Sequence, residues 1–136
     1  MSRRAKEREC GQAEAHSRLD QAIAFLGVAI LGHAAEDGPD RSVSTSNAVL
    51  APIAAADTIT CATLRRHSVS PSHPDAVALV GQVPHIGGEV ASHLARLLAM
   101  KTKAQYEARH PTRAEASQAV RLAGRLVALA RESLGG

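Results

Sequence analysis

TRAEASQAVRLAGRLVALA, residues 112–130, carries the clearest periodic pattern in the chain. Its apolar side chains recur every three or four residues, which is the period of an α-helix with one face against a core. Thr112 and, three residues later, Glu115 form a capping-box pattern that marks a helix N-terminus. We therefore expect an amphipathic helix over 112–134. Its inward stripe is Ala116, Val120, Ala123, Leu126, Val127, Ala130 and Leu134.

The rest of the chain shows the same helical period. We expect further helices over residues 12–36, 45–67, 74–83 and 88–108. Gly38-Pro39 closes the first, the Ser/Thr cluster at 42–46 opens the second, and Pro74 suits the first turn of the short third. We find no strand-like alternation and no internal repeat. Short connections favour antiparallel neighbours, so the sequence predicts an all-α, up-and-down bundle of four or five helices.

Apolar side chains assign an inward face to the other long helices. The expected inward residues are Leu19, Ile23, Leu26 and Ile30 on the first helix, Val49, Leu50, Ile53, Cys61 and Leu64 on the second, and Val90, Leu94, Leu97 and Leu98 on the fourth. On the first helix, Phe25, Val28 and Leu31 lie off this stripe. A helix that is apolar on more than one side is either central in its bundle or shared with a second subunit, and we expect a homodimer.

Length and composition fit one small domain of 136 residues. We expect a basic, flexible tail over residues 1–11 and a single helical domain over 12–136. No apolar run reaches the roughly 18 residues of a membrane span, and the basic N-terminus has no apolar segment of a secretory signal behind it. Cys10 and Cys61 lack the spacing of a disulfide framework, so we expect reduced thiols in a cytoplasmic protein.

Positive charge gathers at both ends of the chain. Residues 92–136 carry eight basic and three acidic side chains. Such a surface could attract phosphate, although scattered arginines on an alanine-rich helix are more typical of a solvated face. Aromatic residues make up 1% of the chain, which counts against recognition of single-stranded RNA by base stacking.

Two charged residues interrupt the apolar stripes. Lys101 lies seven residues after Leu94, and Asp57 lies four residues after Ile53, so each falls on its helix's expected inward face. A charge facing a core costs on the order of several kcal/mol unless it is paired. We therefore expect a buried Asp57–Lys101 ion pair that fixes the register of two helices. The alternative is a polar cleft that accepts a ligand.

Other candidate groups indicate little chemistry. Tyr106 points about 140° away from Lys101 around the helix and suits packing at a helix end or a subunit contact. We expect Lys103 and Arg109 to be solvated. The seven histidines show no metal-ligand spacing, no glycine-rich phosphate loop is present, and no Ser or Cys has a nucleophile's context. We expect no metal, no cofactor and no catalytic residue.

The end of the chain resembles a HEPN domain. KTKAQY, residues 101–106, followed by the helix over 112–130, is similar to one HEPN branch, in which the penultimate helix closes with a basic residue, two variable positions, Ala, Asp and Tyr. The matching positions here are Lys101, Ala104, Gln105 and Tyr106. NAVLAPIAAADTITCATLRR (47–66) and SHPDAVALV (72–80) resemble the family's second and third helices, so the likeness covers about residues 12–134.

The resemblance implies a helical bundle that is often homodimeric. Many HEPN domains are metal-independent ribonucleases, with an Arg, four to six residues and a His at the end of the penultimate helix. Here no His follows Lys101 at that spacing, so the resemblance implies a non-catalytic module that binds a partner protein, a nucleotide or RNA. In related systems the partner is a nucleotidyltransferase. The alternatives are a ribonuclease using Arg66 and His73, which match the spacing elsewhere in the chain, and a purely structural bundle.

Overall fold

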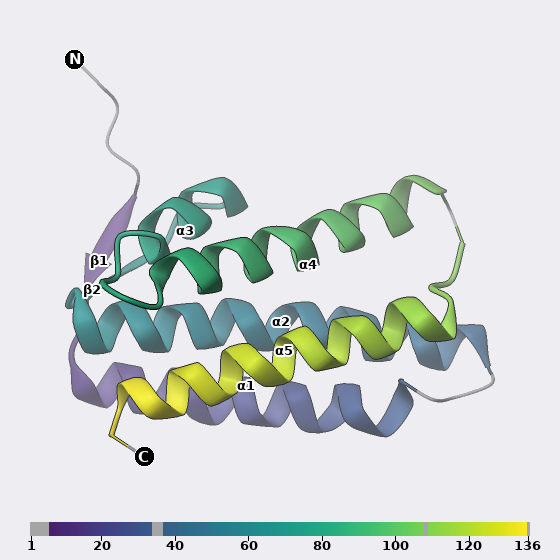
Figure 1. Ribbon diagram of the computed structural model, residues 1–136, viewed down its shortest axis with the longest axis horizontal. Coiled ribbons are helices and arrows are strands. Elements are labelled where there is room, and N and C mark those ends of the chain that lie inside the picture. Colours follow the sequence, from purple (N-terminus) through teal and green to yellow (C-terminus); the bar gives the residue numbers. More distant parts are fainter. Residues whose placement is uncertain (1–5, 34–36, 108, 136) are drawn as a thin grey trace.

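The structure is a computed structural model that describes residues 6–33, 37–107 and 109–135, with side chains outside 103–107. In this part of the chain the elements are β1 (Glu7–Glu9), α1 (Gln12–Gly32), α2 (Gly38–Thr63), β2 (Arg66–Ser68), α3 (His73–Val80), α4 (Gly87–Glu107) and α5 (Arg113–Ser133). Helices α1, α2 and α5 lie side by side, and α4 crosses above α2 with α3 packed beside its first half (Figure 1). The predicted all-α bundle is confirmed.

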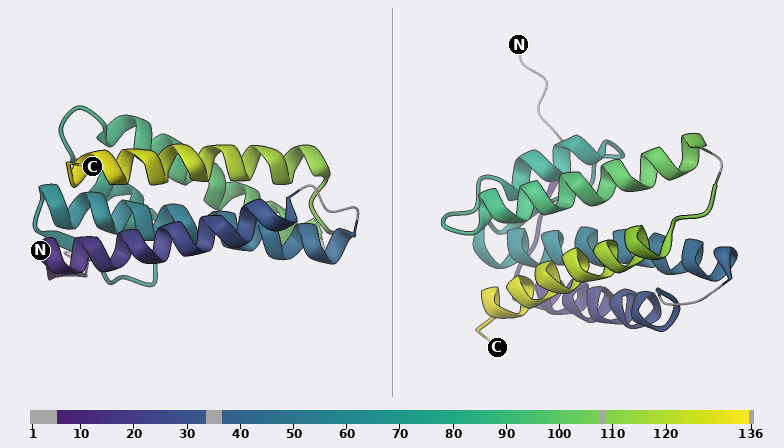
Figure 2. Two further views of the ribbon diagram at one scale, coloured as in Figure 1. Left: turned by 90° about the horizontal axis from the view of Figure 1, so that it is seen from below. Right: turned by 45° about the vertical axis from the view of Figure 1, so that its right-hand side comes forward.

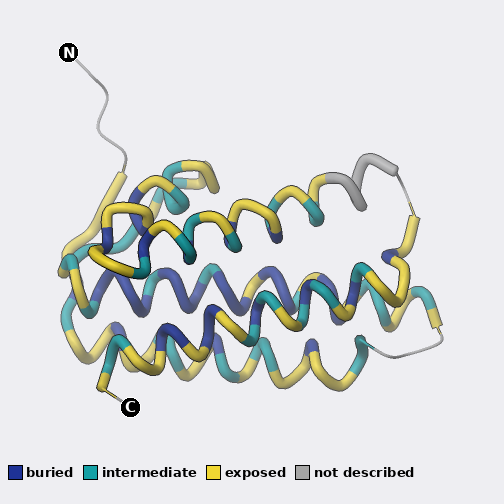
Figure 3. The backbone as a smooth tube through the Cα atoms, viewed as in Figure 1, coloured by how far each residue is buried: buried dark blue, intermediate teal, exposed yellow. Residues whose placement is uncertain are grey.

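Helix α2 lies at the centre of the bundle, in contact with α1, α5, α4 and α3. Figure 3 shows it buried along most of its length. Its buried residues are mostly small: Ser44, Thr45, Ala48, Val49, Ala51, Pro52, Ala54, Ala55, Ala56, Thr58, Ile59, Thr60 and Cys61. Leu50, expected inside, is 40% exposed. The larger side chains were assigned inward, whereas alanines face the neighbouring helices because small residues let helix axes approach closely.

Helix α1 repeats this pattern. Its fully buried residues are Ala15, Ala22 and Ala29, spaced seven residues apart. The expected inward stripe is therefore wrong for Ile30, which is 50% exposed. Its other members, Leu19, Ile23 and Leu26, are only partly buried where they pack against the core. An alanine stripe gives a weak hydrophobic signal, so the bulkier flanking residues dominated the sequence pattern.

Helices α4 and α5 match their predictions. Val90, Leu94 and Leu97 are buried on α4, and Ala116, Ala119, Ala123, Leu126, Val127, Leu129 and Ala130 are buried on α5. The capping box is present, since the hydroxyl of Thr112 accepts from the backbone N–H of Glu115 at 3.1 Å and the Glu115 carboxylate accepts from the Thr112 N–H at 2.9 Å. Both apolar stripes could be predicted because charged residues occupy the outer face of each helix.

The turn between α1 and α2 differs from the prediction. Helix α1 ends at Gly32, and Pro39 lies in the first turn of α2 rather than closing α1. A proline suits this position because its missing N–H would lack a helical partner there. The Ser/Thr cluster consequently lies inside α2, where Ser44 donates a 2.6 Å hydrogen bond to the carbonyl of Ala29 and joins the two helices.

Residues 6–10 of the expected N-terminal tail lie in the described part of the chain and include strand β1. Strand β1 pairs antiparallel with β2, placing Glu7 opposite Ser68, Arg8 opposite His67 and Glu9 opposite Arg66. Each strand has only three residues. That is too short for an alternation of polar and apolar side chains to predict a strand from the sequence.

A disulfide joins Cys10 to Cys61, whose Cα atoms are 5.3 Å apart. The expectation of reduced thiols is therefore corrected, since 51 residues of separation say nothing about proximity in the fold. Figure 2 shows from two further sides how α1 and α2 run together toward this end. Among the described residues, no helix has both the length and the apolar character needed to cross a membrane.

Candidate polar site around Arg18 and Asp57

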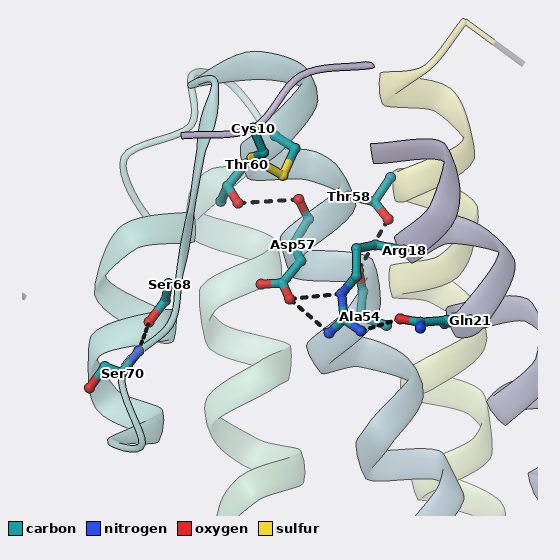
Figure 4. A network of polar contacts seen from close by, with 10 residues as sticks. Cys10, Arg18, Gln21, Ala54, Asp57, Thr58, Thr60, Ser68 and Ser70 are labelled. Atoms are coloured by element: carbon teal, nitrogen blue, oxygen red, sulfur yellow. Dashed lines mark hydrogen bonds and ion pairs between the residues drawn. A yellow bond between two sulfur atoms is a disulfide. The ribbon is translucent and has the colours of Figure 1, made fainter. Parts of the chain in front are cut away.

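Asp57 on α2 pairs with Arg18 on α1 (Figure 4). Two guanidinium nitrogens, Nε at 2.9 Å and Nη2 at 2.7 Å, contact the same carboxylate oxygen, Oδ2. The third nitrogen, Nη1, donates to the side-chain oxygen of Gln21. The other carboxylate oxygen of Asp57 points away from Arg18 (Figure 4). Arg18 is thus held at both ends, and half of the carboxylate is directed elsewhere.

Burial dominates the protonation behaviour of Asp57. Its side chain is 13% exposed, against 30% for Arg18. Desolvation raises the pKa of Asp57 above its ordinary value, and the charge and hydrogen bonds of Arg18 offset only part of this rise. The Asp57 carboxylate is therefore paired with Arg18, yet it accepts a proton more readily than the carboxylate of an exposed aspartate does.

A hollow of about 390 Å³ opens beside this pair. We call it the Arg18 pocket. Its lining residues are Ala13, Glu14, Ser17, Arg18, Cys61 and His67. His67 comes from β2, and its Nδ1 is buried with no hydrogen-bond partner among the described residues. A buried polar atom without a hydrogen-bond partner costs about 1–3 kcal/mol of stability, so Nδ1 of His67 is an unfavourable feature of the fold.

Glu14 supplies a second carboxylate at the rim. It accepts a 3.0 Å hydrogen bond from the backbone N–H of Gly11, and this bond is the main reason that the pKa of Glu14 is lowered. The pocket is thus lined by the charged side chains of Glu14 and Arg18 and by the imidazole of His67.

The expected Asp57–Lys101 pair is wrong. Asp57 lies six residues before the end of α2, or about 9 Å, and Lys101 lies fourteen residues after the start of α4, or about 21 Å. These helix ends meet at the same end of the bundle (Figure 1). The two residues are therefore offset by roughly 12 Å along it. Lys101 is half-buried. A helical wheel gives a residue's direction but not its position along a neighbouring helix.

The other residues singled out from the C-terminal half have mixed outcomes. Tyr106 and Lys103 belong to α4, but their side chains lie outside the described part. Arg109 is exposed, as expected, yet its guanidinium makes two contacts with Glu115, at 2.8 and 3.0 Å. It therefore supports the start of α5 rather than being merely solvated.

Arg66 and His73 do not share a pocket. Arg66 on β2 pairs with Glu7 at 2.9 Å and donates to Gln82 at 3.0 Å. Gln82 follows the end of α3, whereas His73 begins that helix and lines a separate apolar groove against α4. The two residues therefore contact opposite ends of α3, about 12 Å apart along its axis.

Sequence reasoning missed the residues that do meet Asp57. Arg18 follows Ala15 by three residues and precedes Ala22 by four. The sevenfold alanine spacing, had it been taken as the buried stripe, would have placed Arg18 at the edge of the α1–α2 contact. Nothing local could have found His67, because β1 brings it into place.

No group of three or more His, Cys, Asp or Glu side chains in the described ranges is arranged to hold a metal ion. Comparison of the chain with known protein families, with curated proteins and with solved structures finds no match.

Proposed function

We propose that this chain is a non-catalytic, HEPN-like helical module that acts in the cytoplasm as a homodimer. The observation that carries the proposal is an apolar surface on the outer side of α1 and α2. We call it the α1–α2 patch. Its members are Val28 (46% exposed), Leu31 (87%), Val43 (56%) and Leu50 (40%).

These four residues are exposed on the neighbouring helices α1 and α2. Val43, Leu50 and Asp57 are seven residues apart on α2 and therefore share a face. Asp57 contacts Arg18, so this face borders the side of α1 that carries Arg18. Val28 lies ten residues after Arg18, about 80° round the helix from it. The Ser44–Ala29 hydrogen bond holds the end of α1 against the start of α2, at the end of the bundle that carries Val28, Leu31 and Val43.

A second copy of the chain is the occupant that best fits this patch. Homodimer interfaces are more apolar at their centre than other protein contacts, and the patch carries no charged residue among its members. A twofold axis would place the patch against itself and close the assembly.

The remaining parts of the proposal rest on the resemblance and on the separation of candidate groups. A ribonuclease using Arg66 and His73 is not favoured, because Arg66 is engaged by Glu7 and Gln82 away from His73. The resemblance suggests a nucleotidyltransferase as a further partner, with a nucleotide or RNA as the other ligand classes. The low aromatic content favours a protein partner over single-stranded RNA.

Sedimentation velocity at micromolar concentration tests the dimer. Wild-type chain is expected at twice 14.2 kDa. Val28→Asp should sediment as a monomer, because it buries an unpaired charge in the interface. Ile30→Asp is the matched control, since Ile30 is similarly exposed at 50% and lies on the opposite flank of α1. It should remain dimeric.

Two results would count against the proposal. A wild-type chain that is monomeric at tens of micromolar, on the order of common dimer affinities, would overturn it. Dissociation by Ile30→Asp but not by Val28→Asp would show that copies associate through another face.

A further inference from the structure

The Cys10–Cys61 disulfide lies between two hollows. Cys61, fully buried, lines the Arg18 pocket. Cys10, 8% exposed, lines a second hollow of about 420 Å³. The guanidinium-bearing residues Arg65 and Arg66 line that second hollow. Glu9 and Leu64 complete its lining. This hollow is a route by which a small dithiol can reach Cys10 for thiol–disulfide exchange, which requires access to a sulfur.

Few non-covalent contacts hold the segment that Cys10 anchors. We call residues 6–10 the β1 strap. Besides the three-residue strand pairing, the Cys10 N–H donates to the carbonyl of Arg65 at 3.0 Å and the Val69 N–H donates to that of Lys6 at 3.1 Å. Glu7 also pairs with Arg66 at 2.9 Å. All three residues of β1 are exposed. A two-stranded ribbon alone is marginal in water, so the disulfide is the strap's principal anchor.

The strap is coupled to the Arg18 pocket through His67. Arg8 of the strap is the register partner of His67. His67 in turn lines the pocket together with Glu14 and with Arg18, which is the partner of Asp57. Removing the strap would free β2 and change one wall of the pocket.

Arg65 forms the joint between α2 and β2. Its φ of 62° lies in the left-handed region, which is unfavourable for a residue with a side chain. The carbonyl of the same residue accepts the Cys10 N–H. Strap docking therefore helps to hold a strained backbone position, and release of the strap permits Arg65 to relax.

We propose that the Cys10–Cys61 pair is a redox switch. When oxidised it locks the β1 strap against β2, whose His67 lines the Arg18 pocket, and when reduced it releases the strap. A dithiol supplies two electrons and two protons. Its thiolate attacks one sulfur, the Sγ–Sγ bond breaks, both cysteines become thiols, and the dithiol leaves as its own disulfide. In the cytoplasm proposed above, protein disulfides are typically transient and redox-sensing. The switch goes beyond the proposed dimer and does not depend on it.

Dithiothreitol treatment of the oxidised full-length chain tests the switch. Thiol alkylation followed by mass measurement reports the redox state, and amide hydrogen exchange reports the strap. Reduction should speed exchange at the amides of Cys10 and Val69 by at least about tenfold, as expected for local opening. It should leave core amides of α2 and α5 protected. The NMR chemical shifts of the His67 ring protons should change in the same step, because the surroundings of β2 change.

Variants separate the bond from its surroundings. Cys10→Ser should show the open strap with or without dithiol. Glu7→Gln, which removes the ion pair with Arg66 but keeps the disulfide, should stay protected when oxidised. If Cys10→Ser fails to fold, the wild-type dithiol series still decides the matter.

Three outcomes would overturn the switch. The two sulfurs could stay bonded in excess dithiol under native conditions, which indicates a permanent staple. Reduction could leave exchange at Cys10 and Val69 unchanged. It could also unfold all helices together, in which case the bond supports the fold as a whole rather than a local device.

Discussion

Arg18 binds Asp57 through one carboxylate oxygen, and this geometry determines how the pair responds to substitution. Arg18→Ala leaves a half-buried carboxylate without its partner and should lower the free energy of unfolding by about 1–3 kcal/mol at pH 7. Urea denaturation measures the loss. Arg121→Ala is the matched control, because Arg121 is an exposed arginine on α5; it should change stability by less than about 0.5 kcal/mol. Equal effects of the two substitutions would remove any special role for the Arg18 contact.

Asp57 also makes stability depend on pH in a defined direction. Burial raises its pKa above the ordinary 3.8. The folded state therefore binds the proton more tightly than the unfolded state. Its contribution to stability is fully present below pH 3.8 and is lost as pH rises through the raised pKa.

Relative to Asp57→Asn, wild type should thus lose stability as pH rises from about 4 toward neutrality, in the window that this pKa sets. Urea midpoints of both proteins, measured at several pH values, give the difference directly. The opposite slope would mean that Arg18 outweighs burial and lowers the pKa of Asp57.

Helix α5 begins with a capping box whose acid is strongly perturbed. The hydrogen bond from Arg109 and the backbone N–H of Thr112 lower the pKa of Glu115 to about 2. A lowered acid pKa gives stability that is present above the ordinary 4.5 and is lost as pH falls toward 2. Since the Glu115 side chain is 32% exposed, solvent screens part of this effect.

Glu115→Ala should consequently cost about 1 kcal/mol at pH 7, and the cost should shrink near pH 2. Glu115→Gln is the informative control because glutamine can still accept the Thr112 N–H but carries no charge for Arg109. Thermal unfolding at both pH values checks the ranking. If the glutamine variant is destabilised as much as the alanine variant, the whole stabilising contribution of Glu115 comes from its charge.

The helices that could be predicted well are those with one charged face. Helix α5 has Arg113, Arg121, Arg125 and Arg131 outside and a buried stripe that matched in most positions. Helices α1 and α2 could not be predicted so well, because alanines rather than leucines face their contact. Leu50 and Ile53, chosen as inward, lie on the least buried side of α2.

Only part of the candidate site could be predicted from the sequence. Asp57 stood out as a charge among apolar residues, and it is indeed partly buried and paired. Its partner was misassigned, because direction around α4 says nothing about distance along it. His67 and the disulfide depend on where β1 docks, and contacts between segments so far apart leave no local pattern.

The disulfide links the strap to the stability of the entire bundle. It closes a loop of 51 residues, and the chain-entropy relation gives a maximum of about 4 kcal/mol for a loop of that size. The effect acts mainly on the unfolded chain, which is less constrained after reduction. A single domain has roughly 5–15 kcal/mol of stability, so the bundle should remain folded when the bond is broken.

Three proteins test this expectation in urea: oxidised wild type, reduced wild type and the Cys10→Ala, Cys61→Ala double variant. Reduced wild type should lose up to about 4 kcal/mol relative to oxidised wild type. The double variant should lose a similar amount, plus a small cost for the atoms removed at the fully buried Cys61. Comparison with reduced wild type separates that packing cost from the cross-link. A loss below about 1 kcal/mol on reduction would mean that the unfolded chain already holds the two cysteines near each other.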